Sequence, residues 1–86
     1  MDLSLEGVLS LKEKRQIIKS IINRIHSRFN VSIAEVDAQD KWQYAVLGFC
    51  CVSNDAAHAN SILSNVVKFI ENDGRVVMVD YSIEII

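Results

Sequence analysis

Two helical stripes of apolar residues, each flanked by strand-like segments, constrain the fold of this chain more than any other feature. The first stripe follows Ser10, and its members are Leu11, Ile17, Ile18, Ile21, Ile22, Ile25 and Phe29. The second follows Asp55, and its members are Ala59, Ile62, Leu63, Val66, Val67 and Ile70. In both stripes apolar residues recur every three or four positions, which is typical of a helix with one face on a core. We therefore predict two amphipathic helices.

Polar residues mark the expected ends of these helices. Ser10 and Glu13 have the spacing of a capping box, in which each side chain accepts a hydrogen bond from a free backbone amide. Residues 53–55 supply N-cap candidates for the second helix. Gly74 follows that helix and is expected to adopt a left-handed C-terminal cap.

Strand-like patterns occupy the segments around the helices, at residues 2–6, 31–36, 42–52 and 75–86. Segment 42–52 is apolar at both alternating sets of positions, which is typical of a strand covered on both faces. The order βαββαβ predicts an α+β, ferredoxin-like fold, with a four-stranded antiparallel sheet and both helices on one face. A length of 86 residues indicates a single domain over residues 1–86.

The outer face of this sheet is expected to be an interface. Because both helices cover one face, whichever side of segment 42–52 points outward exposes an apolar patch, and such patches usually mark interaction sites. We therefore expect a homo-oligomer, most simply a homodimer, formed through the outer sheet face.

Composition excludes several classes of protein. Half of the residues are apolar and 23% are charged, which is typical of an ordered globular chain. The longest uncharged run, from Trp42 to Asn54, is well short of the roughly 20 residues that a membrane span needs. Asp2 and Glu6 stand where a secretory signal would be basic. These features favour a cytoplasmic protein.

The two cysteines, Cys50 and Cys51, are adjacent. Neighbouring strand residues point to opposite faces, so the pair can neither bridge nor share a metal. We expect both to be reduced, buried and structural, in keeping with a reducing compartment.

Catalytic and metal-binding patterns are missing from the sequence. The loop at residues 7–10 has neither the cysteine pair of a heavy-metal domain nor the arginine of an acylphosphatase-like site. Tyr44 and Phe49 have opposite strand parity and cannot form the aromatic platform of an RNA-recognition motif. We expect no catalytic residue, no metal and no cofactor, and an enzymatic function ranks below a binding function.

The charge distribution is the one functional signal. Residues 10–30 hold six of the nine basic residues and only one acid, Glu13. The candidate contacts to an anionic partner are Lys12, Arg15, Lys19, Arg24, His26 and Arg28. On a helical wheel Lys12, Arg15, Lys19 and His26 form one ridge, and the other two lie on the opposite flank. This pattern favours RNA or the ribosome as a partner. The alternative is a solvated helix on a homo-oligomeric protein-interaction module that binds no nucleic acid.

Several segments of the chain carry a family resemblance. They read SLKEKR at 10–15, RFNVSIAEV at 28–36, DKWQYAVLG at 40–48, VSND at 52–55, FIE at 69–71 and VDYSIEI at 79–85. In these segments the chain resembles the YlxP-like family of small bacterial proteins, a domain-of-unknown-function family. The resemblance implies a ferredoxin-like fold and no particular activity, and relatives often sit beside genes of translation and ribosome maturation. Relatives usually have several more residues before the first strand and Leu-Pro-Gly in place of residues 5–7. The first strand is therefore expected to be short or truncated.

Overall fold

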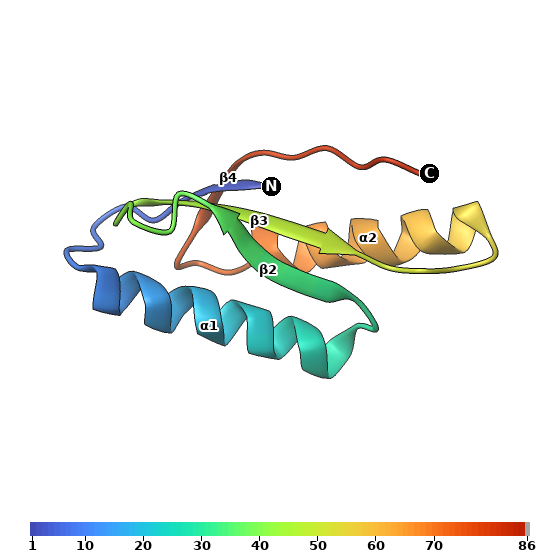
Figure 1. Cartoon of the computed structure of the whole chain (residues 1–86), viewed down its shortest axis with the longest axis horizontal. Helices are drawn as coiled ribbons and strands as arrows, with labels where there is room; N and C mark the ends of the chain where they lie inside the picture. The colour runs from blue at the N-terminus through green and yellow to red at the C-terminus, as the bar shows by residue number, and fades with distance from the viewer. Residues whose placement is uncertain (86) are drawn as a thin grey trace.

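A computed structural model describes residues 1–85 and contains two helices and four strands. In chain order these are β1 (Asp2–Ser4), α1 (Leu11–Arg28), β2 (Ser32–Asp37), β3 (Tyr44–Cys50), α2 (Ala56–Glu71) and β4 (Val77–Asp80). The strands form one sheet in the order β2-β3-β1-β4, and every neighbouring pair is antiparallel (Figure 1). This topology confirms the predicted ferredoxin-like fold.

The hydrophobic core lies between the sheet and the two helices. Alternate strand residues point into it, namely Leu3, Ile33, Ala45 and Leu47, and Val76 joins them from just before β4. The helices contribute the predicted stripes, most completely at Ile18, Ile21, Ile25, Val66 and Ile70. Because one set of strand positions and both helices share a single core, both helices cover the same face of the sheet.

The opposite face of β3 is left open by the chain. Tyr44 and Cys50 are exposed and Val46 is half-buried, so the prediction that β3 is covered on both faces is not met within the chain. The Val36 side chain of β2 packs over Gly48, where an added Cβ would be 3.0 Å from the Val36 Cγ1. Trp42, which the sequence placed in this strand, precedes it and is 52% exposed.

The last strand is much shorter than expected, because β4 ends at Asp80 rather than at residue 86. Its register with β1 shifts, so that Leu3 faces Met78 while Asp2 faces Asp80, and Val79 is the extra residue of a bulge. Beyond Asp80 the chain continues as a nearly straight segment that belongs to no strand (Figure 1). The alternating pattern of residues 81–85 is therefore compatible with a strand, but it does not show whether another strand lies beside them to pair with.

Within residues 1–85, left-handed backbone occurs at Gly7 and at Ala38, which have φ angles of 82° and 59°. Gly74 is not among them, so the prediction that it forms a left-handed cap after α2 is wrong. Asn72 ends α2 in right-handed conformation, and its N–H bonds back to the carbonyl of Lys68.

Candidate nucleic-acid interface

Helix α1 begins at the predicted cap. The Ser10 Oγ accepts a hydrogen bond from the Glu13 N–H at 3.1 Å. The Glu13 Oε2 reaches back to the N–H of Leu9 at 3.3 Å, one residue before the cap itself. These contacts satisfy amides that have no partner inside the helix, and they fix where its basic face starts.

One of the six basic residues of this segment is internal. Lys14 has no exposed surface, and its Nζ donates to the carbonyl oxygen of Ala38 at 2.6 Å. The same Nζ lies 2.8 Å from the Glu35 Oε2, the distance of an ion pair, although the two groups are not aligned as a hydrogen bond. Lys14 therefore fastens α1 to β2 and contributes nothing to the surface charge of the helix.

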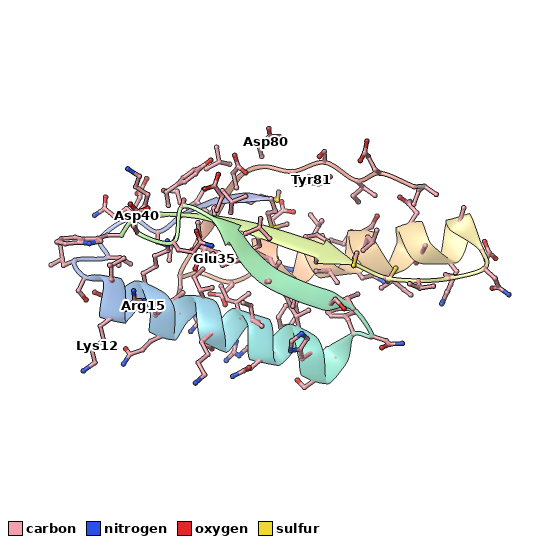
Figure 2. The ribbon with its side chains drawn as sticks, viewed as in Figure 1. Lys12, Arg15, Glu35, Asp40, Asp80 and Tyr81 are labelled. Carbon is pink, nitrogen blue, oxygen red and sulfur yellow. The ribbon has the colours of Figure 1, made fainter. Side chains whose placement is uncertain are left out.

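The sequence holds a signal for this burial. Lys14 precedes Ile18 by four positions and Ile21 by seven, which places it on the core-facing stripe. A lone lysine in that register needs an internal acid, and Glu35 supplies it from an inward position of β2, between α1 and the sheet (Figure 2).

The six predicted contact residues are all exposed, but the structure does not bring them together. Helical spacing groups four of them on one side of the core stripe, and we call this group the basic ridge: Lys12, Arg15, Lys19 and His26. Figure 2 shows Lys12 and Arg15 on the N-terminal half of α1, on the opposite side of the molecule from Asp80.

The other two predicted residues lie on the flank that faces α2. The Arg28 Cζ stands 5.0 Å from the centroid of the Phe69 ring, a cation–π distance, and Phe69 in turn meets Phe29 edge to face. Hydrogen bonds from Arg75, and to a smaller extent the charge of Arg24, lower the pKa of Asp73 below its ordinary value. Arg28 thus contacts α2 through Phe69, whereas Arg24 acts only through its charge on Asp73, just beyond that helix.

The basic ridge carries unneutralised charge. Within residues 1–85 the ion pairs are Lys14–Glu35 and Asp73–Arg75, so no ridge side chain is paired with an acid there. Such side chains are free to contact phosphate groups without breaking an internal interaction.

The outer sheet face has the opposite character. The Tyr44 hydroxyl donates to the Asp2 Oδ2 at 2.5 Å, and Asp2 faces Asp80 across the β1–β4 pair. The hydrogen bond to Asp2, with desolvation and the charges of Asp2, Asp37 and Asp80, raises the pKa of the Tyr44 hydroxyl. The molecule therefore has a basic helix on one side and an acidic, partly apolar sheet face on the other.

Both cysteines are free thiols. Both were predicted to be buried, and only Cys51 is partly so. Cys51 is half-buried beside the Ala59 carbonyl, whereas Cys50 is exposed. The expectation of burial is wrong for Cys50, because it lies at an outward position at the end of β3.

A cavity that the sequence did not predict lies beside the free end of β3. It has a volume of about 720 Å³ and is bounded by Met1, the end of β3, the N-terminal half of α2 and residues 82–85. The sequence analysis expected residues 75–86 to form a strand. It therefore gave no reason to expect that residues 82–85 would line a cavity. The cavity lies beside residues 47–50, the part of β3 that continues past the residue paired with Asp2.

These features define a class of protein, a small ferredoxin-like α+β domain with a basic first helix. In the described part of the chain, no helix is both long and apolar enough to cross a membrane. The model of a family described as a protein of unknown function (DUF503) matches residues 1–83. The chain is also 41% identical over 63 residues to the uncharacterized protein YlxP of Bacillus subtilis (strain 168), covering 73% of this chain and 68% of that relative. The chain belongs to the DUF503 family, which confirms the YlxP-like resemblance.

Proposed function

We propose that the protein is a non-enzymatic, cytoplasmic RNA-binding protein whose basic ridge contacts the phosphate backbone. The observation that supports this function is the contrast between Lys14 and its neighbours. The lysine at a core position is paired with an acid, while Lys12, Arg15 and Lys19 project from the helix without an acidic partner within residues 1–85.

The geometry of the ridge suits backbone contacts rather than base recognition. From Lys12 to His26 the ridge extends for about 21 Å along a straight helix. Long, flexible basic side chains along such a line neutralise successive phosphates and carry little sequence information. We expect affinity for single-stranded RNA or ribosomal RNA that is modest and falls steeply with salt.

The test compares two charge-reversed pairs in a filter-binding assay with a single-stranded RNA oligomer. Lys12→Glu/Lys19→Glu alters the ridge, and Lys41→Glu/Lys68→Glu makes the same change in net charge at exposed sites elsewhere. The ridge pair should lose at least about tenfold in affinity and show a flatter salt dependence, because about two phosphate contacts are removed. The control pair should lose much less.

Circular dichroism should show that both variants remain folded, since exposed substitutions usually change stability by less than about 0.5 kcal/mol each. Equal losses in the two pairs would mean that net charge, not the ridge, attracts RNA. A parent protein that binds no RNA at low salt would overturn the function altogether.

Self-association through the outer sheet face is a second candidate, supported by its exposed apolar side chains. Val36, Tyr44, Val77 and Val79 are all exposed large residues of β2, β3 and β4. If two copies pair through this face, Asp2 and Asp80 of one copy come close to the same carboxylates of the other. Salt screens the repulsion between these carboxylates, so dimerisation should strengthen as salt is added. RNA binding has the opposite salt dependence.

The dimer is tested by sedimentation equilibrium of the parent, Val79→Lys and Val52→Lys. Val79 lies on the outer face, whereas Val52 is exposed beyond the end of β3. A salt-promoted dimer that Val79→Lys abolishes and Val52→Lys retains would support this interface. A parent that stays monomeric in high salt would exclude it.

A further inference from the structure

The single tryptophan of the chain stands outside the hydrophobic core. Trp42 lies in the connection between β2 and β3, residues 38–43, which we call the β2–β3 loop. It is 52% exposed, and it belongs neither to the buried core nor to the half-buried residues packed against that core. Among the described residues 1–85, every aromatic and cation–π pair involves the Phe69 ring, so no ring or cation is stacked on the Trp42 indole there. The indole therefore has accessible surface that the fold does not use.

Hydrogen bonds hold the β2–β3 loop at both of its ends. At its start, the carbonyl oxygen of Ala38 accepts a hydrogen bond from the Lys14 Nζ at 2.6 Å. At its end, the Gln43 Nε2 donates to the carbonyl oxygen of Val8 at 3.0 Å. Trp42 directly precedes Gln43, so its indole is presented from a segment that is already fixed. Such a fixed surface loses little conformational entropy when a ligand binds to it.

The same bonds place the loop at the N-terminal end of α1, where the basic ridge begins. Lys14, which bonds to the loop, directly precedes Arg15 of the ridge. Figure 2 shows Asp40 of the loop at the same end of the molecule as Lys12 and Arg15. The loop carries one acid, Asp40, and one base, Lys41. It therefore adds an aromatic surface to this end of the ridge and no net charge.

An exposed aromatic ring beside unneutralised cations is the combination that binds unpaired bases of a nucleic acid. The cations neutralise phosphates along the strand, while the ring stacks on the face of a base. In a double helix the bases are already stacked on one another, so recognition by stacking is directed at single strands, loops and ends. The position of Trp42 beside the basic ridge therefore favours a single-stranded partner over a duplex.

We propose that Trp42 stacks on an unpaired base of the RNA whose phosphates contact the basic ridge. This inference rests on the proposed function and deepens it, because it adds one base contact to a site made of charges. The strand follows α1 from Lys19 past Lys12 and ends its contact at the β2–β3 loop. Stacking accepts any base, so the site binds single-stranded RNA with little regard to its sequence.

Two RNA probes test the stacking contact on the parent protein. One is a short single strand, and the other is a strand of the same length built from abasic residues, which has the phosphates but no bases. Trp42 is the only tryptophan, so tryptophan emission reports on this site alone. The single strand should quench the emission, because a stacked base contacts the indole. In filter binding the abasic strand should bind at least about fivefold more weakly, and it should leave the emission almost unchanged.

Three variants of the full chain separate stacking from charge. Trp42→Ala should lose at least about fivefold in affinity for the single strand, whereas Trp42→Phe should keep most of it because a ring remains. Tyr81→Ala is the matched control and should bind like the parent, since Figure 2 shows this exposed aromatic residue on the opposite side of the molecule from Lys12. The loss in Trp42→Ala should be equal at all salt concentrations, because no phosphate contact is removed. Thermal melting checks that each variant is folded.

The proposal is overturned if folded Trp42→Ala binds the single strand as tightly as the parent, or if emission stays constant while RNA binds. In both cases Lys12→Glu/Lys19→Glu would still lose affinity, so the proposed function would stand without the base contact. If Trp42→Ala weakens the abasic strand as much as the complete one, the indole supports the loop and contacts no base, which also overturns the proposal. A parent that binds neither strand at low salt overturns both the base contact and RNA binding.

Discussion

At the scale of single residues, Lys14 determines how α1 sits on the sheet. Its ammonium group is enclosed by the Ala38 carbonyl and the Glu35 carboxylate, and Glu35 is itself mostly buried. Removing one member of a buried pair leaves the other charge without compensation, whereas replacing both by apolar residues does not.

Lys14→Met should therefore lower the free energy of unfolding by about 3 kcal/mol, because Glu35 remains buried and unpaired. The double variant Lys14→Met/Glu35→Leu should recover most of that loss. Urea denaturation of the parent and both variants measures the difference. A single variant that loses less than about 1 kcal/mol would show that water reaches Glu35 and that the pair is unimportant.

Tyr44 gives a prediction that depends on pH. Its hydrogen bond to Asp2 and the nearby carboxylates raise the pKa of the phenol, so the folded protein keeps this proton to higher pH than the unfolded chain. The stability linked to Tyr44 is therefore present at neutral pH and is lost as the pH rises through the folded pKa.

Absorbance titration of tyrosinate, with Tyr44→Phe as the reference for assignment, should show a late step for Tyr44. In Asp2→Asn that step should move toward the ordinary tyrosine range, because the charge beside the hydroxyl is gone. An unchanged step in Asp2→Asn would contradict the contact between the two side chains.

At the scale of elements, the helices follow from local sequence and the strand ends do not. Helix α1 begins after the predicted Ser10 cap and ends at Arg28, next to the last residue of the predicted stripe, because its stripe and cap are encoded within the helix itself. The end of β4 depends instead on whether β1 lies beside it. Ile83 and Ile85 continue the alternation of a strand, yet the pairing with β1 ends at Asp80, which faces Asp2.

The candidate site was predictable to a similar extent. The exposure of Lys12, Arg15 and Lys19 follows from helical spacing and is observed. The burial of Lys14 had a signal in the same spacing, but its acid partner comes from β2 and is visible only in the folded chain. The cavity beside the end of β3 is lined by segments that are far apart in the sequence, and no single segment encodes it.

The cap of α1 should contribute measurably to stability. Ser10→Ala removes the acceptor for the Glu13 amide and should cost about 1 kcal/mol in thermal or urea unfolding. Ser27→Ala is the control, since Ser27 is exposed near the other end of the helix and bonds only to the Arg24 carbonyl. Equal effects of the two substitutions would argue against a capping role for Ser10.

At the scale of the whole molecule, the shape is elongated and the basic and acidic residues lie on different sides. The chain measures 42 by 23 by 20 Å, with α2 and residues 81–85 extending past the end of β3 (Figure 1). Small-angle scattering in low salt should give the size of this elongated monomer, whose Cα radius of gyration is 12.9 Å. If the outer sheet faces pair, the radius should grow as salt is added. A radius that is large in low salt and shrinks on adding salt would contradict both the acidic face and its screening.

The separation of the basic ridge from Asp2, Asp37 and Asp80 also has a kinetic consequence. Charges of opposite sign on opposite sides give the molecule a permanent dipole moment, so the field of a polyanion exerts a torque on it before contact. Rotational diffusion is then biased, and most encounters occur with α1 leading and the sheet trailing. The sheet face would then remain turned toward the solvent.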